Sequence, residues 1–197
     1  MPVPDTPPES VPAAPSPPTP GGEGAEGPEP WDLLLYTGQY VDTIFVHILQ
    51  FKKREYRHSF VDVVGLARPI GVHVGPFALE AEGNIGLHRG IQQHAEVNGL
   101  LVARLSGLGF AAAPASLAIG EGLSLASAEP RLEREDNDGV SNPFLHYLMV
   151  EADLVLPGLP HRSRAMLRIH HRSGVFGAFC PRTCGSNFIT GGVKIEL

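Results

Sequence analysis

Cysteine, long apolar runs and basic residues near the N-terminus are scarce in this chain of 197 residues. Cys180 and Cys184 are its only cysteines, too few for a disulfide-dense scaffold or a four-cysteine zinc ribbon. The sequence lacks an uninterrupted apolar run of about 18 residues, so it predicts no transmembrane helix. The first 30 residues contain no Lys or Arg, which excludes the basic start of a signal peptide in this stretch.

Proline is concentrated at the N-terminus. Residues 1–30 hold 11 of the 19 prolines together with five acidic residues. Such a segment buries too little apolar surface to offset the entropy of ordering it, so we predict a disordered Pro-rich acidic tail over 1–30. Subtracting the charge of the tail, −5, from the total of −6 leaves about −1 for residues 31–197. A nearly neutral body argues against nucleic acid as a partner, because neutralising phosphates requires clustered Lys and Arg.

Apolar residues recur at every second position from Trp31 onward, which is the period of a β-strand. Glu80 and Glu82, for example, share one face of a segment whose other face carries Leu79 and Ile85. The same alternation predicts eight strands, near 33–42, 58–68, 73–88, 94–106, 115–127, 144–156, 163–174 and 187–197. A short turn at 68–71 should separate the second and third of them, because Pro69 and Gly71 interrupt the pattern. One or two helical turns fit only near 44–51.

Eight antiparallel strands of this length fit a soluble barrel of lipocalin type or an outer-membrane barrel. The polar faces hold charges of both signs: Asp62, Arg68, Glu80, Glu82, Glu121, Glu151, Asp153, Arg168, Arg172, Lys194 and Glu196. Mixed signs favour an enclosed network of ion pairs, and the opposite, aliphatic faces suit lipid. We therefore predict an all-β protein, an eight-stranded antiparallel outer-membrane-type β-barrel over 31–197. A soluble lipocalin-like binder is the alternative that fractionation would test.

The orientation of such a barrel places its loops. With both chain ends on the periplasmic side, loops 43–57, 128–143 and 175–186 lie outside the cell. The middle loop contains a cluster of acidic residues, Glu133, Glu135, Asp136 and Asp138, which could attract divalent ions but which we predict to be a solvated surface. An outer-membrane location also requires export, so it depends on a leader that residues 1–30 do not contain.

A histidine and a serine lie two residues apart near the end of the seventh predicted strand. Positions i and i+2 project from one face of a strand, so the His171 ring and the Ser173 hydroxyl can approach each other. Their parity is that of Leu167 and Ile169, on the face predicted to contact lipid. Catalysis is one interpretation of this pair. The other is that the apolar stripe simply ends at the headgroup layer, where polar residues are common.

Several segments resemble the lipid A 3-O-deacylase family, the PagL-like acyloxyacyl hydrolases. They are His-Arg-Ser-Gly at 171–174, Gly-Ser-Asn-Phe at 185–188, Gly-Gly-Val-Lys-Ile at 191–195, Tyr-Thr-Gly-Gln-Tyr at 36–40 and Gly-Glu-Gly-Leu-Ser at 120–124. The resemblance covers residues 31–197 and implies an eight-stranded outer-membrane barrel. It also implies an enzyme, a carboxylic ester hydrolase that removes an ester-linked acyl chain from the lipid A of lipopolysaccharide.

Carried over by position, the resemblance implies that Ser173 is the nucleophile and His171 the general base. The family follows its serine with Asn, where this chain has Gly174. Its orienting Glu lies about a dozen residues after the serine, in the region where this chain has Asn187. Asn187 is therefore the candidate that orients the imidazole. The alternative is an inactive relative, a non-catalytic outer-membrane barrel with a structural or interaction role.

Cofactors and metals have no candidate site in the sequence, because the remaining histidines are dispersed without a repeated ligand spacing. The expected partners are lipid A, or lipopolysaccharide, and the bacterial outer membrane. Cys180 and Cys184 have two interpretations, a short disulfide in an exported loop or two unpaired thiols.

Overall fold

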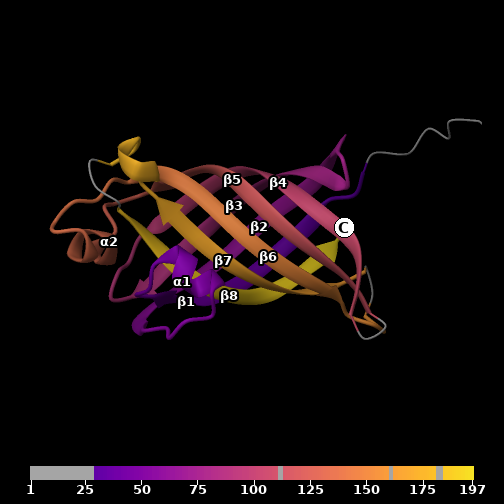
Figure 1. The fold of residues 1–197 in the computed structure, drawn as a ribbon, viewed down its shortest axis with the longest axis horizontal. Helices are drawn as coiled ribbons and strands as arrows, with labels where there is room; N and C mark the ends of the chain where they lie inside the picture. The colour runs from indigo at the N-terminus through magenta and orange to yellow at the C-terminus, as the bar shows by residue number, and fades with distance from the viewer. Residues whose placement is uncertain (1–28, 111–112, 160–161, 181–183) are drawn as a thin grey trace, which may run out of the picture.

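The computed structural model describes residues 29–110, 113–159, 162–180 and 184–197, and these form a closed antiparallel barrel (Figure 1). Each strand pairs with its sequence neighbour, and β1 pairs with β8 to close the sheet. The strands are β1 (Asp32–Val41), β2 (Tyr56–Val74), β3 (Phe77–Gly90), β4 (Ala95–Phe110), β5 (Ala113–Ala126), β6 (Phe144–Val155), β7 (Arg164–Ser173) and β8 (Gly185–Glu196). The prediction of an eight-stranded barrel is confirmed. The tail predicted for 1–30 lies outside the described residues up to position 28.

The helices gather at one end of the barrel (Figure 1). They are α1 (Phe45–Leu49), α2 (Arg131–Asp136) and the 3-10 helix η1 (Val175–Gly177). We call this the loop end, and the end that holds the start of β1 and the end of β8 the terminal end. The three long loops therefore share one end, as predicted. None of the helices within the described ranges has the length and apolar character needed to cross a membrane.

The barrel interior is charged at its middle and terminal end. Arg168 is fully buried and donates to Glu82 at 2.8 Å and to Glu151 at 2.6 Å. Arg104 donates to Glu80 and Asp153, at 2.6 and 2.7 Å. Every one of these groups has a partner of opposite charge, which buried ions require. Large aliphatic side chains cover the outside, so the faces have the polarity of an outer-membrane barrel and not of a lipocalin.

Three charges predicted to point inward lie on the outside. In β2 the inward positions belong to Val61, Val63 and Ala67, which pack in the apolar core, so the intervening Asp62 projects outward. Arg68 has the same outward parity, and its guanidinium lies 5.2 Å from the Trp31 ring. In β5, Gly120 and Gly122 face inward against Leu100, which turns Glu121 out. Neighbouring residues of a strand point to opposite faces, so the inward positions beside these three charges place all three side chains on the outside.

The turn predicted at 68–71 is wrong, because β2 continues to Val74. The pairing between β2 and β3 shifts between Pro69 and His73. Proline has no N–H to give the ladder, and Gly71 has a φ of +69°, so this stretch forms an irregularity inside the strand. The chain reverses after Val74, at Gly75.

Candidate functional site

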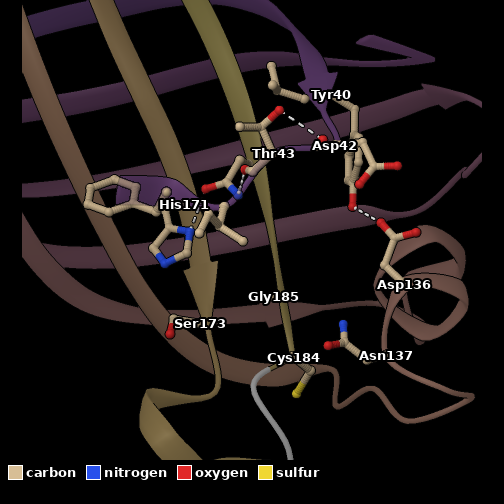
Figure 2. A pocket seen from close by; sticks show the side chains of 13 residues that line it. Tyr40, Asp42, Thr43, Asp136, Asn137, His171, Ser173, Cys184 and Gly185 are labelled. Atoms are coloured by element: carbon tan, nitrogen blue, oxygen red, sulfur yellow. Dashed lines mark hydrogen bonds between the residues drawn. The ribbon is translucent and has the colours of Figure 1, made fainter. Parts of the chain in front are cut away.

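His171 and Ser173 lie on the outer face of β7 where the strand reaches the loop end. The ladder between β7 and β8 sets His171 opposite Asn187. Figure 2 shows His171 and Ser173 projecting from the same side of β7. The structure thus brings the three predicted site residues onto one patch of the outer wall.

Asn187 holds the His171 ring. The ring Nδ1 lies 2.7 Å from Asn187 Oδ1, and Asn187 Nδ2 donates to the backbone oxygen of Thr43 at 2.9 Å. A carbonyl oxygen only accepts, so the amide nitrogen must face Thr43 and the amide oxygen must face His171. His171 Nδ1 therefore has the proton, and its Nε2 has the free lone pair that a general base needs. The Phe45 ring stacks on the imidazole at 4.7 Å and 26° and fixes its plane.

The Ser173 hydroxyl forms a hydrogen bond within its own loop. Its Oγ accepts from the backbone N–H of Val175 at 3.1 Å. In the part of the chain that the structure describes, no hydrogen bond joins Ser173 to His171. His146 of β6 lies directly opposite Ser173 in the ladder, on the same outer face. No sequence pattern singles out His146, and only the register between β6 and β7 brings it beside Ser173.

An open pocket of about 580 Å³ lies beside these residues (Figure 2). The segment before and into α1 forms one wall, and the end of α2 forms another. Tyr40 and Asp136 join these walls, since the Tyr40 hydroxyl donates to Asp136 Oδ2 at 2.6 Å. The lining residues are Tyr40, Val41, Asp42, Thr43, Ile44, Phe45, Asp136, Asn137, His171, Ser173, Cys184, Gly185 and Asn187. The pocket therefore offers a small ligand both apolar and polar contacts.

The acidic loop predicted to be solvated contains α2, which turns Leu132 and Glu133 into the barrel mouth. Glu133 accepts from Arg172 at 2.9 Å and from the Ser186 hydroxyl at 2.7 Å. Burial raises the pKa of the Glu133 carboxyl, and the Arg172 guanidinium opposes that shift. The solvated interpretation is therefore wrong for Glu133, whose ion pair fixes α2 over the mouth and shapes the pocket wall.

The loop after β7 is closed by a disulfide between Cys180 and Cys184, which decides between the two interpretations of the cysteines. Both cysteines are buried against Leu145. The backbone of Gly174 donates to Cys184 O at 2.7 Å. The disulfide thus ties the loop to the end of β7, beside Ser173.

A cluster of potential metal ligands lies inside the loop end, where the dispersed spacing of the histidines predicts no site. Ligand atoms of His88, His94 and Glu96 all lie within 4.8 Å of one another. The His88 and His94 rings stack at 4.0 Å and 13°, so their in-plane lone pairs run parallel and do not converge on one ion. His88 also contacts Glu96 at 3.1 Å, and His170 contacts Glu96 at 2.8 Å. In this arrangement His88, Glu96 and His170 form a buried hydrogen-bond network across β3, β4 and β7. Among the described residues, the His94 ring joins it only through the ring stacking.

No protein-family model matches the chain, and no curated protein matches it. Among solved structures, the crystal structure of the outer membrane enzyme PagL aligns with a TM-score of 0.55 and 11% sequence identity, over 84% of this chain and 99% of that chain. The crystal structure of Neisserial surface protein A (NspA) aligns with a TM-score of 0.47 and 9% identity, over 85% and 97% of the two chains. At such identities the likeness to PagL shows the fold alone, and the likeness to NspA is too weak to support any argument.

Proposed function

We propose that this chain is an outer-membrane β-barrel that hydrolyses an ester-linked acyl chain of lipid A, with Ser173 as nucleophile. Three observations support the proposal. The barrel has a charged interior and an aliphatic outer wall, its fold is similar to that of an outer membrane enzyme, and its sequence resembles the lipid A 3-O-deacylase family.

The observation on which the proposal depends most is the 2.7 Å contact between His171 Nδ1 and Asn187 Oδ1. It leaves His171 Nε2 unprotonated on the face that presents Ser173. His171 removes the hydroxyl proton while Ser173 Oγ attacks the ester carbonyl carbon. The sugar alcohol leaves with that proton, and the acyl group remains on Ser173. Water then attacks the acyl-enzyme, releases the fatty acid and restores the serine.

The position of the pair on the outer wall explains how this enzyme would meet its substrate. Leu167 and Ile169 precede His171 on the same face of β7, and Leu167 is largely exposed. An acyl chain of the outer leaflet would lie along this stripe. Its ester would then stand at headgroup depth beside Ser173, so the reaction needs no deep binding cleft.

Lipid A mass spectrometry after expression in a host without such an activity tests the proposal. Ser173→Ala and His171→Ala should each abolish the loss of one acyl chain, and the double variant should be little worse, because the two residues act as a unit. Ser106→Ala, an exposed serine at the terminal end, is the matched control and should leave the loss unchanged. Full activity of Ser173→Ala would refute the nucleophile assignment.

A non-catalytic barrel is the second candidate, and the state of Ser173 favours it. Its hydroxyl is engaged by Val175, and no carboxylate within the described segments hydrogen-bonds to His171. If the wild-type chain folds in the host membrane and the mass of lipid A stays unchanged, this second function is the correct one.

A further inference from the structure

The loop that contains α1 exposes an unusual amount of apolar surface. Ile44, Val46, Leu49 and Phe51 are 60%, 48%, 42% and 85% exposed. Phe51 has a φ of +55°, a backbone conformation that bulky residues rarely adopt, and its ring is the most exposed of these side chains. Large apolar side chains grouped in this way on a surface mark a contact with a partner or a membrane.

Cations follow these apolar residues at once. Lys52, Lys53 and Arg54 form the one run of three consecutive Lys or Arg residues in the sequence. The Lys53 side chain is 89% exposed, and its ion pair with Glu55 is long, at 3.9 Å. Such an exposed pair holds the lysine weakly. Arg54 lies 5.7 Å from the Phe51 ring, so a cation and an apolar ring stand side by side.

Charge is distributed unevenly over the loop end. The neighbouring α2 loop has a net negative charge, because its acidic residues outnumber Arg131 and Arg134, with which Glu135 and Glu129 form ion pairs, whereas residues 52–54 are basic. An anionic surface that meets the loop end is therefore attracted to the α1 loop and repelled by the α2 loop. The combination of an apolar face with adjacent lysines is typical of segments that lie in a lipid interface.

The same loop also forms part of the candidate site. Thr43 accepts the hydrogen bond of Asn187, and Phe45 stacks on His171. The position of the α1 loop in a lipid interface would thus fix the depth of His171.

We propose that residues 44–54 form a membrane-interface element, in which the apolar side chains enter the acyl-chain boundary and Lys52 and Lys53 bind phosphate-bearing lipid headgroups. The inference rests on the bilayer location in the proposed function, but not on catalysis. Each lysine should favour an anionic over a zwitterionic lipid roughly fivefold, the effect of one cation near such a surface.

Tryptophan fluorescence tests the apolar part, because the chain has a single tryptophan, Trp31. Trp31→Phe with Phe51→Trp puts the reporter on the α1 loop of the full chain, folded into phosphatidylcholine and phosphatidylglycerol vesicles. We expect blue-shifted emission and quenching by lipids brominated near the headgroup. Trp31→Phe with Glu129→Trp is the control on the α2 loop, and its emission should resemble that of tryptophan in water.

Three outcomes would overturn the membrane assignment. The first is water-like emission at position 51 without quenching. The second is equal quenching at positions 51 and 129. The third is a blue shift at position 51 that changes with the protein-to-lipid ratio but is not accompanied by quenching from the brominated lipids. The last would assign the surface to a second copy of the chain. Adding Ser173→Ala to the position 51 reporter should leave the quenching unchanged, so a failure of catalysis cannot be mistaken for a failure of this inference.

Spin-labelled lipids test the phosphate part. The wild-type barrel should retain phosphatidylglycerol in preference to phosphatidylcholine, and Lys52→Gln with Lys53→Gln should reduce that preference up to about 25-fold, as two cations would. Arg131→Gln with Arg134→Gln, on the α2 loop, is the charge-matched control and should preserve it. An unchanged preference in the lysine variant would overturn the phosphate assignment.

Discussion

Asn187→Ala measures the role of Asn187, because the structure assigns both polar atoms of its side chain. Oδ1 faces His171 and one N–H of Nδ2 donates to Thr43 O, so both contacts support an orienting role for the side chain. The variant removes both hydrogen bonds, and the one that positions the imidazole is a neutral bond with a net contribution of about 1–1.5 kcal/mol. Since about 1.4 kcal/mol corresponds to a tenfold change in rate, we expect a roughly tenfold slower deacylation. Loss of an oxyanion donor would instead cost about 10²–10³-fold.

The assay is single-turnover release of fatty acid from lipid A in mixed micelles, with the folded fraction measured by the heat-dependent mobility of the barrel on gels. Asn187→Asp is the companion variant, because its carboxylate can still accept from His171 and stabilise the imidazolium that forms. Its rate should exceed that of Asn187→Ala. A rate for Asn187→Ala equal to wild type, or lower by 10³-fold with the barrel still folded, would refute an orienting role.

Two further predictions concern the loop end. Glu133→Ala removes the carboxylate that hydrogen-bonds to the buried Arg172 and leaves that arginine, among the described residues, only the Glu96 carboxylate at 3.7 Å. We expect the free energy of unfolding, measured by urea titration in micelles, to fall by up to about 3–5 kcal/mol. An unchanged midpoint would contradict the pairing. Burial lowers the pKa of His94 to about 3, with His88 and Arg172 acting in the same direction and Glu96 opposing them. The unfolded chain therefore binds this proton more readily, and stability should fall as the pH drops from about 6.5 toward 4. His94→Gln should flatten that slope in urea titrations, and equal slopes in the two proteins would disprove the effect.

Much of the barrel could be predicted from the sequence because a strand has a strict period of two. Glu80 and Glu82 share a face whatever the rest of the chain does, and the sequence pattern of β3 alone places them opposite Leu79 and Ile85. The predicted inward position of Asp62 is wrong because its neighbours Val61 and Val63 both point inward, and adjacent residues of a strand point to opposite faces.

The helix α2 could not be predicted from local signals. It has six residues, and its N-cap position is Pro130, which forms no side-chain capping hydrogen bond. Its position depends on Glu133 meeting Arg172, which is 39 residues away in sequence. A contact of that separation exists only after the barrel has closed.

In the candidate site, too, some features follow from local strand geometry and others depend on contacts between residues far apart in the sequence. The i and i+2 relation of His171 and Ser173 follows from strand geometry alone. The contact between Asn187 and Thr43 spans 144 residues, because β1 and β8 meet only at barrel closure. The stacking of His88 on His94 likewise depends on a turn conformation that the spacing of the two residues does not reveal.

The filled interior of the barrel also bears on whether ions can pass along its axis. Arg168, Tyr147, Met149 and Phe188 are fully buried and project inward from β6, β7 and β8. Ions moving along the axis would have to displace these side chains and break the ion pairs of Arg168. Within the described residues these side chains therefore fill the axis of the barrel, and the surfaces left to contact other molecules are its outer circumference and its two ends.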